Sequence, residues 1–196
     1  MFTGIVAAVG RIVAVQPAEE SMKLSIDAGS LDLSDVSEGD SIAVNGCCLT
    51  VVRRHGAVFD ADVSQETLGC TTGLNRPGDV NLEKSLRLAD RLGGHLVSGH
   101  VDGVGEVVRF EPVGESYLLA IRAPAELSGY IARKGSICVQ GVSLTVNSVE
   151  GARFEVNLIP HTLEVTTLKD LRVGTRVNLE VDMIARYVER LMRGDA

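Results

Sequence analysis

The sequence predicts an all-β protein made of two tandem small β-barrels and a C-terminal helix. Two observations support this fold class. The chain repeats itself at a nearly constant spacing of 95 residues, and each copy carries roughly half a dozen short segments that are rich in Val and Ile and bounded by turn residues. Two copies are too few for a stacked repeat array, so each copy must close its own core. Closure into a barrel is favoured over an open sandwich because it removes exposed sheet edges.

The internal repeat is clearest in a central segment of each copy. Residues 41–51 (SIAVNGCCLTV) correspond to residues 136–146 (SICVQGVSLTV), and residues 3–6 (TGIV) correspond to 98–101 (SGHV). The spacing changes only once, to 97 residues, in the segment where Glu83 corresponds to Glu180. We therefore predict a first domain over residues 1–94, a second over 95–182 and a terminal helical segment over 183–196.

Each strand is predicted from a short apolar segment between turn residues. In the first copy these segments are 4–15, 23–28, 41–52, 57–63 and 79–82, and the second copy repeats them. Between the copies, residues 82–92 have the apolar spacing and charges of a short helix that Gly93 and Gly94 would end. We expect this helix to link the two domains.

The chain is predicted to end in an amphipathic helix. Asp182 stands where an N-cap residue belongs, and apolar residues recur after it at helical spacing, opposite charged residues. These apolar residues are Met183, Ile184, Tyr187, Val188, Leu191 and Met192. No core remains for this face to cover, so we expect it to pack on a partner subunit.

The dipeptide Asn45-Gly46 predicts a two-residue type I′ turn between two strands. Alternation along these strands places small polar and thiol side chains on one face of the hairpin and bulkier apolar ones on the other. The small side chains are Ser41, Ala43, Cys48 and Thr50 in the first copy, and Ser136, Cys138, Ser143 and Thr145 in the second. Such residues could simply face water, but a solvent-facing strand usually carries Lys, Glu or Arg, and neither face has any. The repetition favours a functional face in each copy.

Composition excludes several classes of function. The 196 residues carry a net charge of −7 and no stripe of Lys and Arg, which argues against a nucleic-acid partner. No apolar run approaches the ~18 residues of a membrane span, and the N-terminus lacks the basic segment of a signal peptide. Cys47, Cys48, Cys70 and Cys138 show neither CxxC nor zinc-site spacing. We expect a soluble, cytoplasmic protein with reduced thiols and no metal.

Four segments closely resemble the riboflavin synthase family, the α-chain type with two lumazine-binding repeats. They are residues 1–6 (MFTGIV), 45–51 (NGCCLTV), 93–103 (GGHLVSGHVDG) and 159–163 (IPHTL), and the resemblance runs from residue 1 to about residue 192. It implies two six-stranded antiparallel closed β-barrels, a homotrimer, and one 6,7-dimethyl-8-ribityllumazine bound to each barrel. Whether a lumazine synthase capsid encloses the trimer is left open.

The resemblance also implies a reaction. One lumazine donates a four-carbon unit to a second lumazine, which gives riboflavin and 5-amino-6-ribitylaminouracil without a cofactor or a metal. The donor and the acceptor are the same compound, so the protein must treat them differently. Positions where the copies differ are therefore candidates for the acid and base chemistry, namely Cys48 against Ser143, Ile5 against His100, Glu66 against His161, and Ser85 against Asp182.

The ligand contacts implied by the resemblance divide between the copies. Those of the first copy are Gly4, Ile5, Val6, Ser41, Cys48, Leu49, Thr50, Asp62, Val63, Ser64, Gln65, Glu66 and Thr67. Those of the second copy are Gly99, His100, Val101, Lys134, Ser143, Leu144, Thr145, Asn157, Leu158, Ile159, Pro160, His161 and Thr162. The candidate catalytic residues are Cys48, His100, Asp182, Ser41 and Lys134, with His95 nearby. The family's site joins the first copy of one subunit to the second copy of its neighbour, so Lys134 and Asp182 would act across an interface.

Plainer explanations stand beside these assignments. Cys48 could be a small buried hydrophobe, Asp182 only a helix N-cap, and Lys134 only a solvated loop residue. A non-catalytic lumazine- or flavin-binding protein of the same fold is the main alternative function, although such a relative tends to lose the reactive side chains that are present here. A flavin-dependent reductase would need a nicotinamide-binding α/β domain, and the chain has no room for one.

Overall fold

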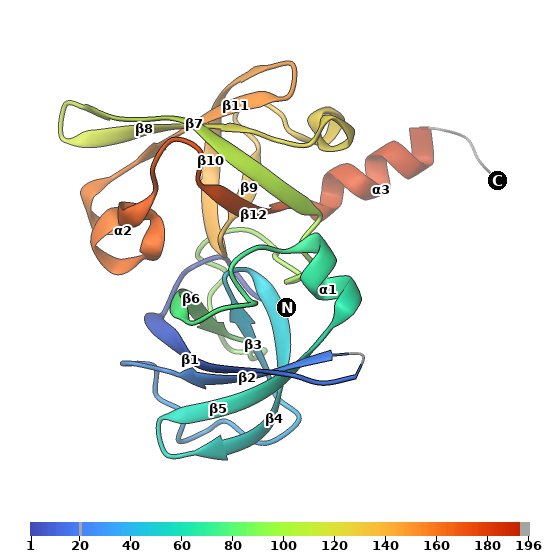
Figure 1. Ribbon diagram of the computed structural model, residues 1–196. Coiled ribbons are helices and arrows are strands. Elements are labelled where there is room, and N and C mark those ends of the chain that lie inside the picture. The colour runs from blue at the N-terminus through green and yellow to red at the C-terminus, as the bar shows by residue number, and fades with distance from the viewer. Residues whose placement is uncertain (20, 193–196) are drawn as a thin grey trace.

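The computed structural model describes residues 1–19 and 21–192. Two closed six-stranded antiparallel barrels lie against each other, and helix α3 (Met183–Met192) projects from the second barrel (Figure 1). The predicted fold class is therefore confirmed. Residues 193–196 of the predicted C-terminal segment lie outside the described residues.

The first barrel has the strand order β1-β2-β5-β4-β3-β6. Its core is filled by Val, Ile, Leu and Phe side chains that alternate along the strands, with Phe59 and Ile12 among the fully buried ones. Helix α1 (Gln65–Cys70) follows β5, and the Ser64 side chain caps it. The strands are β1 (Ala8–Pro17), β2 (Ser21–Asp27), β3 (Ser41–Val44), β4 (Cys47–His55), β5 (Val58–Ser64) and β6 (Gly78–Lys84).

The second barrel repeats this order with β10-β11-β8-β7-β12-β9 around a core centred on Phe154. Its strands are β7 (Gly103–Val113), β8 (Ser116–Arg122), β9 (Ser136–Val139), β10 (Val142–Glu150), β11 (Arg153–Leu158) and β12 (Arg176–Val181). The helical turns are η1 (Ala125–Tyr130), α2 (Pro160–Val165) and η2 (Thr167–Asp170). Helix α2 occupies the place of α1, because both follow the fifth strand of their barrel.

The predicted hairpin register is confirmed. Ser41 pairs with Thr50 and Ala43 with Cys48, around a turn in which Asn45 (φ 49°) and Gly46 (φ 82°) are both left-handed. A type I′ turn requires positive φ at both central residues, which Asn and Gly tolerate better than other residues. The second copy forms the same hairpin from β9 and β10.

The two hairpin turns meet where the barrels touch. A Cβ atom added to Gly46 would lie 2.8 Å from the backbone nitrogen of Gly141, so the turns are in direct contact. Asparagine side chains join the barrels around this point, because Asn81 Nδ2 donates to the Gln140 carbonyl at 2.8 Å and Asn178 Nδ2 donates to the Asn45 carbonyl at 3.1 Å. These bonds are equivalent under the internal repeat, so the barrels are related by an approximate two-fold axis.

A small separate core lies at the same junction. It contains Phe2, Ala43, Val97 and Cys138, with Cys48 packed beside it. Phe2 and Val97 also form an antiparallel bridge. Close packing at the junction thus explains the small side chains of Ala43, Cys48 and Cys138 on the predicted hairpin faces.

The predicted linker helix over residues 82–92 is wrong. Strand β6 continues to Lys84, and residues 85–102 form an extended connection with turns. The backbone N–H of Leu86 donates to the Met1 carbonyl at 2.9 Å, and the Asp90 carboxylate accepts the N–H of Arg87. These contacts use backbone groups that a helix would need for itself.

Candidate functional site

Two arms precede the barrels and cross between them. The first arm is residues 2–6 and the second arm is residues 97–101, which correspond in the internal repeat. Val6 of the first arm packs against the second barrel's core, whereas Val101 of the second arm packs against the first barrel's core. Each arm therefore packs on the barrel of the other copy, whereas the resemblance groups the contacts of each arm with its own copy. The arms pair with each other through the antiparallel bridge between Phe2 and Val97.

The first candidate site is a cavity of about 270 Å³ on the first barrel. Cys48, half-buried on β4, and His100, exposed on the second arm, both line it, together with helix α1 residues Glu66 and Thr67. The Cys48 N–H donates to the Gly99 carbonyl at 2.8 Å. A Cβ atom on Gly99, whose φ is +81°, would lie 2.7 Å from Cys48 Cβ, so only glycine permits this approach.

The second candidate site is the equivalent place on the second barrel. The Ser143 N–H donates to the Gly4 carbonyl at 2.8 Å, as Cys48 does to Gly99. His95 Nδ1 forms a 2.7 Å hydrogen bond with Ser143 Oγ, and the His95 N–H donates to the Thr3 carbonyl at 3.1 Å. His95 Nε2 is buried and has no hydrogen-bond partner among the described residues. A buried ring nitrogen without a partner carries an unmet hydrogen-bonding capacity.

Each arm is held by a buried glutamate. Glu83 Oε1 accepts the Thr3 N–H at 2.7 Å and its hydroxyl at 2.6 Å, and Oε2 accepts the Gly4 N–H at 2.9 Å. Glu180 makes the same three bonds with Ser98 and Gly99. Sequence reasoning did not assign these glutamates to the sites. The repeat contained the signal for them, because Glu83 corresponds to Glu180 just as Thr3-Gly4 corresponds to Ser98-Gly99.

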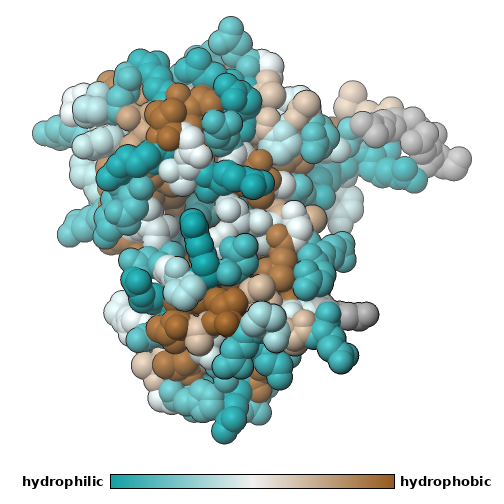
Figure 2. All heavy atoms as spheres, in the orientation of Figure 1, coloured by the Kyte–Doolittle hydropathy of each residue, from teal (hydrophilic) through white to brown (hydrophobic). Residues whose placement is uncertain are grey.

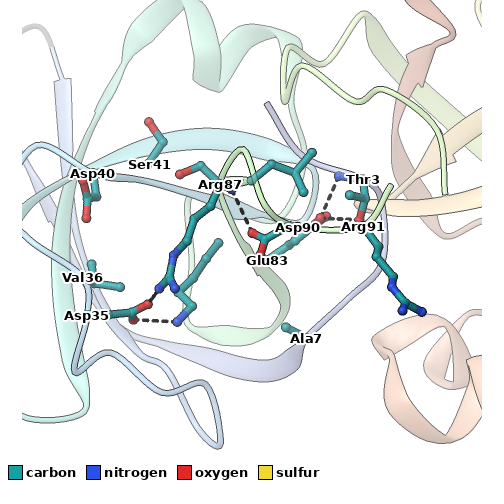
Figure 3. Close-up of a pocket in the computed structure, with 13 residues that line it drawn as sticks. Thr3, Ala7, Asp35, Val36, Asp40, Ser41, Glu83, Arg87, Asp90 and Arg91 are labelled. Atoms are coloured by element: carbon teal, nitrogen blue, oxygen red, sulfur yellow. Dashed lines mark hydrogen bonds and ion pairs between the residues drawn. The ribbon is translucent and has the colours of Figure 1, made fainter. Parts of the chain in front are cut away.

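Ser41 lies apart from the Cys48 cavity. It lines a separate polar cavity of about 550 Å³ with Asp40, Glu83 and Arg87, at the end of the first barrel. Figure 3 shows Glu83 turned toward Thr3 and Arg87 extended toward Asp35. Ser41 thus shares a hairpin face with Cys48 but not its cavity.

The remaining predicted contacts differ in what they offer a ligand. Leu49, Val63, Leu144 and Leu158 point into the barrel cores, so only their backbone groups can reach one. The more exposed positions are Ile5, Thr50, Asp62, Ser64, Gln65, Thr145, Asn157, Ile159, Pro160, His161 and Thr162. Lys134 is exposed in a loop and has a φ of +67°.

Asp182 caps helix α3, as predicted. Its carboxylate accepts the Ile184 N–H at 3.0 Å. The helix is fixed to the second barrel by an ion pair between Arg186 and Asp102, whose carboxylate also accepts the Val181 N–H at 2.8 Å. The negative charge of Asp182 also acts to raise the pKa of His95, the residue that is hydrogen-bonded to Ser143.

Burial lowers the pKa of His95 below its usual value of 6.5, and the negative charge of Asp182 opposes part of this shift. We expect an NMR titration of the His95 ring to have its midpoint below 6.5, and Asp182→Asn to lower the midpoint further. The stability that depends on neutral His95 is present above pH 6.5 and is lost as the pH falls through the lowered pKa. A midpoint that rises in Asp182→Asn would contradict this arrangement.

The described part of the chain holds four free thiols, as predicted. Within these residues, no group of three or more His, Cys, Asp or Glu side chains is placed to hold a metal ion. None of the described helices is long and apolar enough to cross a membrane.

The fold and the paired sites define a class: a duplicated β-barrel protein with a candidate small-molecule site on each barrel. A family model, the lumazine binding domain, matches residues 3–85 and again residues 98–182. The chain is 47% identical to the riboflavin synthase of Photobacterium phosphoreum, over 100% of this chain and 90% of that protein. It is 49% identical to the riboflavin synthase of Mycobacterium bovis, over 98% of each. The chain therefore belongs to the riboflavin synthase family.

Solved structures agree with this assignment. A structure of LumP complexed with riboflavin matches with a TM-score of 0.82 and 29% identity, covering 92% of this chain and 99% of that chain. A structure of LumP complexed with 6,7-dimethyl-8-(1'-D-ribityl) lumazine matches with a TM-score of 0.79 and 27% identity over the same shares.

Proposed function

We propose that this protein is a riboflavin synthase, an enzyme that converts two molecules of 6,7-dimethyl-8-ribityllumazine into riboflavin and 5-amino-6-ribitylaminouracil. The observation that carries the proposal is the duplication of one site in two unlike versions. Cys48 and Ser143 occupy equivalent positions beneath equivalent arms, but one offers a thiol and the other a hydroxyl bonded to His95. Two identical substrates can therefore meet different chemistry.

The atoms of two lumazines balance those of the two products, so the reaction needs no external oxidant or reductant. One substrate must accept a nucleophile while the other loses a proton from carbon. In the first site the Cys48 thiol faces the cavity beside His100 and can act as nucleophile or hydrogen-bond donor to the lumazine ring. In the second site we assign the proton acceptor to His95, whose lowered pKa favours the neutral ring and whose Nε2 has no partner among the described residues.

A non-catalytic lumazine- or flavin-binding protein is the second candidate, because the LumP structures hold riboflavin and a ribityllumazine. The curated relatives favour the enzyme, since proteins named riboflavin synthase are 42–49% identical over nearly the whole chain, against 27–29% for the LumP structures. Cys48 and His100 line the first cavity, and His95 is hydrogen-bonded to Ser143 at the equivalent place on the second barrel.

The test is incubation of the protein with the lumazine alone, followed by absorbance at the riboflavin band. The enzyme forms riboflavin over many turnovers without an added cofactor. A binding protein would instead hold the lumazine unchanged, at no more than one molecule for each site.

The proposed assembly is a homotrimer joined through α3, in which Lys134 and Asp182 complete a site on the neighbouring subunit. Support comes from the apolar stripe of α3, whose side chains Ile184, Tyr187, Val188 and Leu191 are exposed. Hydrophilic side chains, by contrast, cover much of the visible face of both barrels, with smaller apolar patches between them (Figure 2). An exposed apolar helix face of this kind usually packs against another chain.

Removal of residues 183–196 is expected to give a monomer with less than about a tenth of the activity, because the apolar seam and the neighbour's contribution to the site are both lost. Analytical ultracentrifugation gives the mass, and the absorbance assay gives the activity. The matched control is Ile184→Ala with Leu191→Ala, which keeps the helix but removes apolar surface. If the truncated protein still sediments as a trimer, the subunit interface is formed by the barrels and not by α3.

A further inference from the structure

The two buried glutamates occupy places where a charge is costly. Glu83 is 8% exposed and Glu180 is 3% exposed, and neither forms an ion pair with Lys or Arg among the described residues. Burial raises the pKa of both carboxyl groups, while their hydrogen bonds oppose the shift. A buried carboxyl group retained twice at corresponding positions indicates a specific task.

The hydrogen-bond donors to each carboxylate indicate what that task is. Each carboxylate accepts two backbone N–H groups and one hydroxyl, from Thr3 and Gly4 for Glu83 and from Ser98 and Gly99 for Glu180. Corresponding bonds differ in length by no more than 0.1 Å, for example 2.6 Å from the Thr3 hydroxyl and 2.7 Å from the Ser98 hydroxyl. An ionised carboxylate, which only accepts, fits this donor set on both oxygens. A glutamine would turn an NH₂ group toward one of the donors.

The held glycine then contacts the opposite barrel. Gly4, which Glu83 holds, accepts the N–H of Ser143 at 2.8 Å. Gly99, which Glu180 holds, accepts the N–H of Cys48 at the same distance. Glu83 belongs to β6 of the first barrel, but Ser143 belongs to the second. Glu180 belongs to β12 of the second barrel, but Cys48 belongs to the first. Each series of contacts, from the glutamate through the glycine to the site residue, therefore crosses from one barrel to the other.

We propose that Glu83 and Glu180 are positioning residues that set the two sites crosswise. Glu83 fixes the first arm against Ser143 and His95, and Glu180 fixes the second arm, with His100, against Cys48. The proposal rests on the proposed function, in which these places bind the two substrates. It also explains how two sites with different side chains have the same backbone arrangement. The glutamates and the arms are equivalent in the two copies, while Cys48 and Ser143 differ.

The test compares Glu180→Gln with Glu83→Gln by two readouts that need no substrate. The first is alkylation of Cys48 by iodoacetamide, located by fragment-ion mass spectrometry. Cys47, next to it, is a poor competitor because burial raises its pKa to about 12. The second is the NMR signal and titration midpoint of the His95 ring, assigned with His95→Asn.

Glu180→Gln is expected to change the Cys48 alkylation rate by on the order of tenfold and to leave the His95 titration unchanged. Glu83→Gln is expected to shift the His95 signal and leave the Cys48 rate within about twofold of the parent. The control is Glu115→Gln, an exposed turn residue between β7 and β8, which should alter neither readout.

Equal changes at both sites in each variant would reduce the glutamates to general stabilising residues and overturn the proposal. Changes confined to the glutamate's own barrel would also overturn it. If a glutamine variant fails to fold, Ser98→Ala and Thr3→Val each remove one hydroxyl donor. Ser98→Ala must then change the Cys48 alkylation rate, and Thr3→Val the His95 signal, by less than the glutamine variants would. Neither readout depends on turnover, so a parent protein that forms no riboflavin would refute the proposed function while leaving this test intact.

Discussion

Cys48→Ala is expected to lower kcat by about two orders of magnitude or more while changing lumazine affinity by less than about threefold. Cys48 and His100 line the first cavity, where the proposed function places a lumazine ring. A group that acts on the bond-making step stabilises the transition state more than the bound substrate. Single-turnover kinetics and equilibrium binding of the lumazine measure the two quantities separately.

Cys138→Ala is the matched control. Cys138 is fully buried in the small core at the junction, and the repeat already has alanine at the equivalent position, Ala43. This change should cost about 1 kcal/mol of stability and leave kcat within about twofold. Equal losses of kcat and affinity in Cys48→Ala would assign Cys48 to binding or packing instead.

Gly46→Ala is expected to destabilise the protein by about 3 kcal/mol or more, which corresponds to a fall in Tm of roughly 6–12 °C for a chain of this size. The residue has a φ of +82°, and its new Cβ atom would lie 2.8 Å from the backbone nitrogen of Gly141. The left-handed conformation alone costs about 1–2 kcal/mol for a residue with a Cβ atom. The remainder comes from forcing the two hairpin turns apart.

Gly56→Ala separates these two contributions. Gly56 has a φ of +61° in a turn with no atoms within 4 Å of an added Cβ, so only the conformational cost applies. Its Tm should fall by about 2–8 °C, and by less than that of Gly46→Ala. If thermal unfolding shows equal losses in the two variants, the contact between the turns contributes little, and the close junction of the barrels is not needed for stability.

Much of the fold could be predicted because it depends on local patterns that the repeat shows twice. The register of the β3–β4 hairpin followed from Asn45-Gly46, since few other dipeptides take two positive φ angles. The start of α3 followed from the capping side chain of Asp182. Both features are set by neighbours in sequence.

The errors concern long-range contacts. Residues 82–92 have helical spacing, but Leu82 is fully buried in β6 and Leu88 is fully exposed. Backbone groups of this segment bond instead to Met1, Ala7 and Ser41. The arms could not be assigned to a barrel, since residues 3–6 and 98–101 resemble each other and either could fold onto either copy. The crossing depends on contacts far apart in sequence, namely the bridge between Phe2 and Val97 and the bonds of Gly4 to Ser143 and of Gly99 to Cys48.

The most direct test of the central claim, a dismutation of one compound at two unlike sites, is a mass balance. The protein is incubated with 6,7-dimethyl-8-ribityllumazine as the sole reactant under anaerobic conditions, and substrate and products are quantified by chromatography. The account predicts that riboflavin and 5-amino-6-ribitylaminouracil form in equal amounts, each equal to half of the lumazine consumed. Unchanged lumazine, or riboflavin formed without the pyrimidine, would contradict it.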